Sequence, residues 1–186
     1  MGDLHPWSMS ERIALSTNSL EQLVGFDHRL SCSFSAAVSS DALIGLLVQA
    51  SRFGDWGLSF TVGMVLILVR GWTAVAVYAF GTAGGLILQK SLKNFCGRLR
   101  PCQQPKGPPQ RAPIPDQGSF PSGHTLHAVM GAWVISMTVV VLAPVFIILA
   151  VLIAVSRVVL GLHYPSDVAA GAALGLILGQ LVVSVM

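Results

Sequence analysis

Long apolar runs limit what this chain can fold into more than any other feature. A helix needs about 20 apolar residues to cross the hydrocarbon core of a bilayer, and five stretches approach that length. They cover residues 56–69, 73–89, 125–142, 145–162 and 168–186. Only 10% of the 186 residues are charged, whereas soluble domains carry about 25%, and the mean hydropathy is +0.71. We therefore expect an all-α, integral-membrane helical bundle.

The first 52 residues are less regular than the rest. Residues 13–38 combine leucine and phenylalanine with charged side chains, a mixture that predicts an amphipathic helix lying in the membrane interface. Residues 42–50 are apolar but short, and two interpretations stay open. They form either a sixth, tilted span together with residues 34–38, or a re-entrant segment. The bundle is thus expected to have five or six transmembrane helices and an N-terminal interfacial helix.

The composition excludes several other classes of protein. High hydrophobicity with low charge is the opposite of what disorder requires, and three scattered cysteines do not make a disulfide-stapled scaffold. The net charge of +3 would suit a nucleic-acid partner, but most basic residues lie in one loop between apolar runs. We expect a membrane protein with one local basic site and no nucleic-acid partner.

A stripe of small residues marks one face of the last apolar run, at Gly171, Gly175 and Gly179. Such stripes let helix backbones approach closely. We interpret this one as tight packing within the chain rather than as a contact between two copies. The sequence leaves a homo-oligomer open.

Three short segments carry the residues with chemistry. In chain order they contain Lys93, Arg100 and Pro101; then Pro121, Ser122, Gly123 and His124; then Ser156, Arg157, His163 and Asp167. Arg157 lies inside an apolar run, where a charged side chain is costly and normally faces an interior polar site. Its natural partner is an anion.

Several features indicate that this anion is a phosphate. Arginine binds phosphate oxygens through two parallel N–H groups, and lysine adds a point charge. Ser122 and Gly123 precede a predicted helix, and the backbone N–H groups at a helix N-terminus bind anions. No cluster of carboxylates accompanies these groups, so we expect no metal ion. The candidate phosphate ligands are Lys93, Arg100, Ser122, Gly123 and Arg157.

Two histidines and an aspartate are suited to the chemical step. Pro165 disfavours a helix running through Tyr164, so we expect His163 to end one span and Asp167 to begin the next. The carboxylate can hydrogen-bond one imidazole nitrogen and leave the other free to attack phosphorus. His124 can then protonate the leaving oxygen.

The three segments together resemble the signature of the type 2 phosphatidic acid phosphatase family, which also includes vanadium haloperoxidases and glucose-6-phosphatase. The family pattern is Lys, six residues, Arg-Pro; then Pro-Ser-Gly-His; then Ser-Arg, five residues, His, three residues, Asp. This sequence matches every fixed position between residues 93 and 167, and residues 1–50 carry no part of the signature.

The resemblance implies a mechanism without a metal ion or a cofactor. His163 would be the nucleophile that forms a phosphohistidine intermediate, with Asp167 orienting it. His124 would be the general acid that protonates the leaving group and then helps to activate water. The phosphate oxygens would be held by Lys93, Arg100, Arg157, Ser122 and the backbone N–H of Gly123.

The expected activity is hydrolysis of the terminal phosphate of a membrane lipid phosphate or diphosphate. The small chain resembles bacterial members of the family, so undecaprenyl diphosphate is the favoured substrate, followed by phosphatidylglycerophosphate and phosphatidic acid. A lipid-to-lipid phosphotransferase with the same motifs is the alternative among enzymes. A catalytically silent lipid-binding membrane protein is the alternative from another class, although no nucleophile or phosphate ligand is missing here. Five apolar spans argue against a soluble haloperoxidase.

We expect one membrane-embedded domain over residues 1–186, with an amphipathic segment at 1–52 and a catalytic helical core at 53–186. The positive-inside rule would place the basic loop in the cytoplasm. Lys93 and Arg100 are assigned to catalysis, however, and do not count as a topology signal. We therefore expect an inner-membrane protein whose active site faces the outer, periplasmic side.

Three further features are assigned no chemistry. Arg98 is interpreted as a headgroup contact or a topology signal, and His127 as a packing residue. The proline-rich segment from Cys102 to Asp116 is expected to be stiff and extended, with no chemistry of its own.

Overall fold

The structure, a computed structural model, describes residues 9–114, 116 and 118–186, and every regular element in that part of the chain is helical. Its α-helices are α1 (Met9–Ala36), α2 (Asp41–Arg52), α3 (Leu58–Arg70), α4 (Trp72–Cys96), α5 (Gly123–Thr138), α6 (Ala143–Val159) and α7 (Pro165–Val185). Shorter turns connect them, namely the π-helical η1 (Phe53–Gly57) and the 3₁₀ turns η2 (Pro101–Gln103) and η3 (Val140–Leu142).

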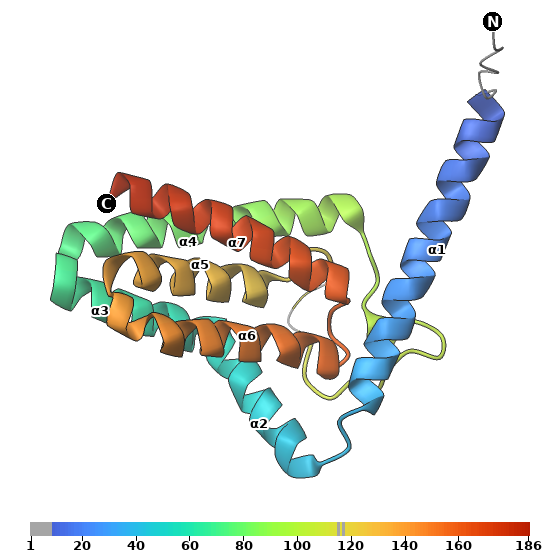
Figure 1. Cartoon of the computed structure of the whole chain (residues 1–186), viewed down its shortest axis with the longest axis horizontal. Helices are drawn as coiled ribbons and strands as arrows, with labels where there is room; N and C mark the ends of the chain where they lie inside the picture. Colours follow the sequence, from blue (N-terminus) through green and yellow to red (C-terminus); the bar gives the residue numbers. More distant parts are fainter. Residues whose placement is uncertain (1–8, 115, 117) are drawn as a thin grey trace, which may run out of the picture.

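Helices α3 to α7 run side by side as a bundle, and α1 crosses one end of it (Figure 1). Helix α5 lies in the middle and packs against α3, α4, α6 and α7. Four helical segments among the described residues are long and apolar enough to cross a membrane; they are Asp41–Arg70, Trp72–Gln103, Val140–Val159 and Pro165–Val185. The all-helical bundle predicted from the apolar runs is confirmed, whereas the count of five or six spans stays a prediction.

The outside of the bundle is apolar as well as its core. Large side chains such as Phe60, Leu68 and Phe80 are 72%, 82% and 79% exposed, while Val62 and Leu66 on the opposite face of α3 are fully buried. Exposed apolar surface on this scale is rare in soluble proteins. In a bilayer it is expected, because lipid tails are the solvent and the helices satisfy their own backbone hydrogen bonds.

The small-residue stripe of α7 packs against α5, as the sequence predicts. A Cβ atom added at Gly171 would lie 2.4 Å from the carbonyl oxygen of Ser122, and one at Gly175 would lie 2.4 Å from that of Leu126. A Cβ at Gly179 would lie 3.0 Å from the Trp133 ring. The two backbones therefore approach each other more closely than any side chain allows.

The two interpretations of residues 42–50, a sixth tilted span or a re-entrant segment, stay predictions; these residues lie in α2. They begin one helical segment, Asp41–Arg70, which passes through η1 without a break. Polar residues at this junction contact other protein groups: Ser51 is buried against Arg157, and Asp55 contacts His124. The helix predicted at residues 13–38 corresponds to α1, and its position at the membrane interface stays a prediction. The domain division at residue 52 also stays a prediction.

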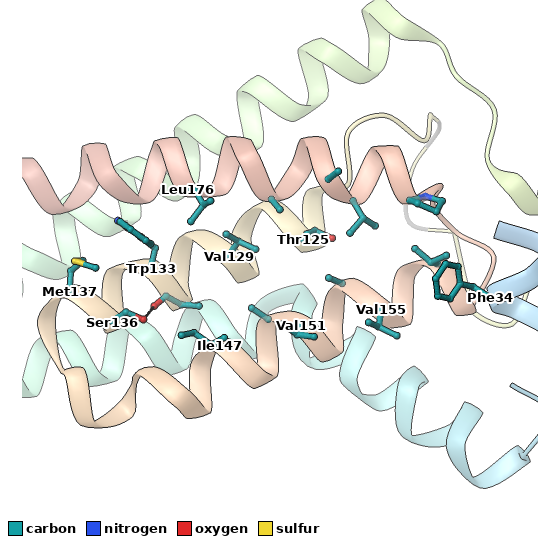
Figure 2. Close-up of a pocket in the computed structure, with 18 residues that line it drawn as sticks. Phe34, Thr125, Val129, Trp133, Ser136, Met137, Ile147, Val151, Val155 and Leu176 are labelled. Carbon is teal, nitrogen blue, oxygen red and sulfur yellow. Dashed lines mark hydrogen bonds between the residues drawn. The ribbon is translucent and has the colours of Figure 1, made fainter. Parts of the chain in front are cut away.

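An apolar groove of about 710 Å³ runs between α6 and α7. Both helices pack closely on α5 but contact each other little, so α5 forms the floor of the groove. Figure 2 shows Val129 and Trp133 of α5 on that floor, with Val151 and Val155 on the α6 side and Leu176 on the α7 side.

The close contact between α5 and α7 predicts a strong effect of Gly175→Ala. The new methyl group would overlap the Leu126 carbonyl, and overpacking of this kind costs about 1–3 kcal/mol. Thermal unfolding in detergent should therefore show a clearly lower Tm. Gly84→Ala is the matched control, because no atom lies within 4 Å of its added Cβ and alanine favours a helix. An unchanged Tm for Gly175→Ala would contradict the observed helix spacing.

Candidate active site

The three signature segments meet at the end of the bundle that α1 crosses (Figure 1). Helices α4 and α6 end there, and α5 and α7 begin there. Lys93 lies in the last turn of α4, and Arg157 lies in the last turn of α6. His163 lies in the short connection between α6 and α7, and Asp167 lies in the first turn of α7.

Lys93 and Arg100 form a buried pair of cations around one carboxylate. Lys93 Nζ lies 2.8 and 2.7 Å from the two oxygens of Asp116, and Arg100 Nη2 donates to Oδ1 over 2.6 Å. Lys93 is 6% exposed and Arg100 is fully buried. Although burial alone would raise the pKa of Asp116, the hydrogen bonds and charges of Lys93 and Arg100 hold it below its usual value. The two predicted phosphate ligands thus bind a two-oxygen anion.

The sequence analysis did not identify Asp116 as a site residue, because the proline-rich segment that contains it was expected to carry no chemistry. Two features of the sequence point to Asp116 as a partner for cations. It is the only acidic residue between Cys102 and Gly118, and it follows a loop rich in basic residues.

His163 directs the electron pair of its Nε2 atom toward Arg100, one member of the cation pair. Its Nε2 lies 3.2 Å from Arg100 Nη1, which also donates to the carbonyl of Leu162 over 2.8 Å. A guanidinium has only donors, so Nε2 accepts, and the ring proton is assigned to Nδ1. Burial lowers the pKa of His163 to about 3, although the nearby Asp167 opposes that change. The imidazole is therefore neutral and nucleophilic at physiological pH.

Asp167 lies beside His163 but is not directly hydrogen-bonded to it. Its Oδ2 is 3.6 Å from Nδ1 of His163, which is longer than a hydrogen bond. That oxygen accepts instead from the Ser119 hydroxyl and, over 2.9 Å, from the backbone N–H of Tyr164. His163 and Asp167 lie next to each other, as the sequence predicts, but the expected direct hydrogen bond between them is absent.

Arg98 contacts protein groups from two other helices, and the headgroup contact stays a prediction. It donates to Asp167 Oδ1 over 2.8 Å and to Asp27 of α1 over 2.6 Å. Its guanidinium carbon lies 3.8 Å from the centre of the Tyr164 ring, a favourable cation–π geometry. Arg98 thus fixes Asp167 and ties α1 to the site, a role that sequence spacing cannot reveal.

Arg157 and His124 line a second, polar cavity of about 170 Å³. Arg157 is 2% exposed and donates from Nη1 to the Ser51 hydroxyl, while its Nε and Nη2 have no partner among the described residues. His124 Nε2 contacts a carboxylate oxygen of Asp55. A buried guanidinium with unpaired N–H groups is costly, and an anion in this cavity would satisfy it.

Ser122 and Gly123 stand at the N-terminus of α5, as predicted. The Ser122 hydroxyl lies 3.0 Å from that of Thr125, and its backbone N–H donates to the Asp167 carbonyl over 3.0 Å. A Cβ at Gly123 would lie 1.6 Å from the side-chain oxygen of Gln89. A larger residue at this position would have to displace the Gln89 side chain, and the contact of Ser122 with Asp167 joins the starts of α5 and α7.

The sequence is similar to lipid phosphatases from several microorganisms. It is 31% identical over 159 residues to decaprenylphosphoryl-5-phosphoribose phosphatase of Mycobacterium tuberculosis, covering 81% of this chain and 85% of that protein. It is 34% identical over 145 residues to phosphatidylglycerophosphatase B of Bacillus subtilis, covering 67% and 66%. It is 30% identical over 139 residues to undecaprenyl-diphosphatase of Sulfolobus acidocaldarius, covering 72% and 66%.

Solved structures show the same fold. A transmembrane PAP2-type phosphatidylglycerolphosphate phosphatase from Bacillus subtilis superposes with a TM-score of 0.71 at 24% identity, over 93% of this chain and 89% of that one. LpxE of Aquifex aeolicus gives a TM-score of 0.75 at 25% identity, over 84% and 93%. The family model of the PAP2 superfamily matches residues 74–186. This chain is therefore an integral-membrane lipid phosphatase of the PAP2 superfamily.

Proposed function

We propose that this phosphatase moves the terminal phosphate of a lipid phosphate or diphosphate first to His163 and then to water. The observation that carries the proposal is the orientation of His163, whose accepting Nε2 faces Arg100 within the pair of cations that holds Asp116. An electron pair and an anion-binding group on the same side of a neutral imidazole are what attack on a phosphate requires.

In the first step, phosphate oxygens replace the Asp116 carboxylate on Lys93 and Arg100, and the unpaired N–H groups of Arg157 bind another oxygen. His163 Nε2 then forms a bond to phosphorus as the bond to the leaving oxygen breaks. His124 donates a proton to that oxygen. The imidazole gains positive charge in this step, and Asp167 stabilises it from 3.6 Å.

In the second step, water attacks the phosphohistidine. His124, now neutral, accepts a proton from the water as the new phosphorus–oxygen bond forms. The phosphorus–nitrogen bond breaks, its electron pair returns to His163, and inorganic phosphate is released. Ser122 and the backbone N–H of Gly123 are proposed to assist the phosphate ligands in both steps.

For the substrate we further propose undecaprenyl diphosphate first, a polyprenyl lipid, and the glycerophospholipids phosphatidylglycerophosphate and phosphatidic acid next. Two of the relatives carry names that refer to decaprenyl and undecaprenyl lipids, and the third is named for phosphatidylglycerophosphate. The proposed location is the inner membrane of a bacterium, with the site facing the outer side.

The nucleophile assignment predicts that His163→Ala abolishes phosphate release, because the variant lacks the imidazole that accepts the phosphate in the proposed first step. Release by the purified protein should also persist in excess EDTA, since three cationic side chains supply the charge stabilisation. The assay compares undecaprenyl diphosphate, phosphatidylglycerophosphate and phosphatidic acid, with Cys96→Ser as the control for purification. Full activity in His163→Ala would rule out this mechanism. Release only when a second lipid is added would indicate phosphotransfer.

Asp116→Asn should lower the KM for the lipid phosphate. The carboxylate occupies the N–H groups that phosphate must reach, and the neutral amide would compete less well. We expect a decrease of about 3- to 10-fold, which corresponds to roughly 1 kcal/mol of binding free energy. Steady-state kinetics in mixed micelles measures this, with Asp41→Asn at the exposed start of α2 as the control. A higher KM would show that Asp116 supports the site rather than competes for it.

The lowered pKa of His163 predicts that its ring stays neutral in weak acid. An ordinary histidine, with a pKa near 6.5, is mostly charged at pH 5.5, whereas His163 with a pKa of about 3 would not be. Nitrogen NMR on histidine-labelled protein follows this directly, and the His163→Ala spectrum assigns the signal. Protonation of His163 near pH 6.5 would be inconsistent with its buried, neutral state.

A further inference from the structure

Asp55, which contacts His124, lies outside both the family signature and the matched family region, residues 74–186. We propose that Asp55 is a positioning residue for the general acid: it holds Nε2 of His124 so that Nδ1 delivers the proton to the leaving oxygen. This inference rests on the proposed function and adds to it a residue that no motif contains.

The backbone around Asp55 is held in place by neighbouring packing. Asp55 lies in η1, the π-helical turn that joins α2 to α3, and single π turns within helices frequently occur at functional sites. A Cβ at Gly54 would lie 2.9 Å from Ile153 of α6, and one at Gly57 would lie 2.6 Å from the Phe53 ring. The turn therefore packs tightly against Ile153 of α6 at Gly54, and it also packs on α5, the helix that carries His124.

The direction of the contact fixes which nitrogen of His124 can act. A carboxylate only accepts hydrogen bonds, so Nε2 carries a proton and donates it to Asp55 Oδ1. When His124 acts as an acid, its other proton is on Nδ1. The leaving oxygen must then lie on the Nδ1 side, while Asp55 keeps the ring in a single orientation.

The charged groups around His124 explain why the Asp55 carboxylate matters for its protonation. Arg157 of α6 and Lys93 of α4 act on His124 electrostatically; Arg52 of α2 lines the same cavity, and His127 follows one turn later on α5. The cations in this set disfavour the charged form of the His124 imidazole. Asp55 is the anion that favours it. Asp55 thus keeps available the protonated form that the first step consumes.

The proton balance is complete with Asp55 ionised throughout. As Nε2 of His163 bonds to phosphorus and the leaving oxygen departs with its electron pair, that oxygen takes the proton from Nδ1 of His124. His124 becomes neutral and keeps the Nε2 proton, which remains hydrogen-bonded to Asp55. In the second step Nδ1 accepts a proton from the attacking water, and the starting state returns.

The test compares Asp55→Asn with two substrates that differ in how much they need an acid. One is an alkyl phosphate, whose leaving oxygen must be protonated; the other is a nitrophenyl phosphate with a matched alkyl tail, whose leaving oxygen need not be. Asp55→Asn should lower kcat by about 10- to 100-fold on the alkyl phosphate, part of the roughly 10²–10⁴-fold that a general acid contributes. On the nitrophenyl substrate kcat should change by less than about threefold, because little general-acid contribution remains to be lost.

Three further readouts separate positioning from simple structural support. The alkaline limb of the kcat profile should move to lower pH in Asp55→Asn, because the charged imidazole loses its counter-charge. Asp55→Glu should restore part of the activity. In the double variant with His124→Ala, Asp55→Asn should add no further loss, since Asp55 acts through that histidine. Asp41→Asn serves as the matched charge control, and unfolding curves report folding.

Equal losses on both substrates, or an unmoved alkaline limb, would overturn the inference and make Asp55 a structural residue. Unchanged activity in Asp55→Asn would also overturn it. The proposed function fails separately, by full activity in His163→Ala. Loss of activity in His163→Ala and His124→Ala but not in Asp55→Asn would remove only the role of Asp55.

Discussion

Buried positive charge at one end of a lipid-facing bundle is the constraint on which this site depends. Lys93, Arg100 and Arg157 are each at least 94% buried, and an isolated charge in such surroundings is very costly. Each is matched by groups brought from elsewhere in the chain. Asp116 joins Lys93 to Arg100, and Ser51 accepts from Arg157. Because two nitrogens of Arg157, Nε and Nη2, still lack a partner among the described residues, the end of the bundle is arranged as a receptor for an anion.

The same packing that stabilises the bundle sets the distances in the site. Gly171 and Gly175 let α7 lie directly on α5, and this contact places the Asp167 carbonyl within 3.0 Å of the Ser122 N–H. The segment with His124 and the segment with His163 are thereby joined at the helix starts. A wider spacing of α5 and α7 would separate the proposed acid from the proposed nucleophile, so stability and geometry share one interface.

The sequence predicts the parts of this site that follow from spacing and hydrophobicity. Apolar runs predict the helices, and the positions of Lys93, Arg100 and His163 within the signature predict that they converge. Partners far apart in the chain are not predictable in this way. Arg98 contacts Asp27 and Asp167 because α1 crosses the end of the bundle, and no periodicity encodes that crossing. Asp55 likewise contacts His124 from a distant part of the chain, and no motif contains it.

The direction of the proposed chemistry also constrains where the lipid tail lies. The leaving oxygen carries the tail, and His124 protonates that oxygen, so the tail leaves the site on the His124 side. Arg157 and His124 line the polar cavity beside α2 and η1, whereas Val158 and Thr125, the next residues along the same helices, line the apolar groove. Successive residues of a helix point in directions about 100° apart, so the cavity and the groove open on different sides of α5 and α6. Under the proposed mechanism we therefore expect the tail of the reacting lipid to extend past α2 and past η1, the turn that carries Asp55.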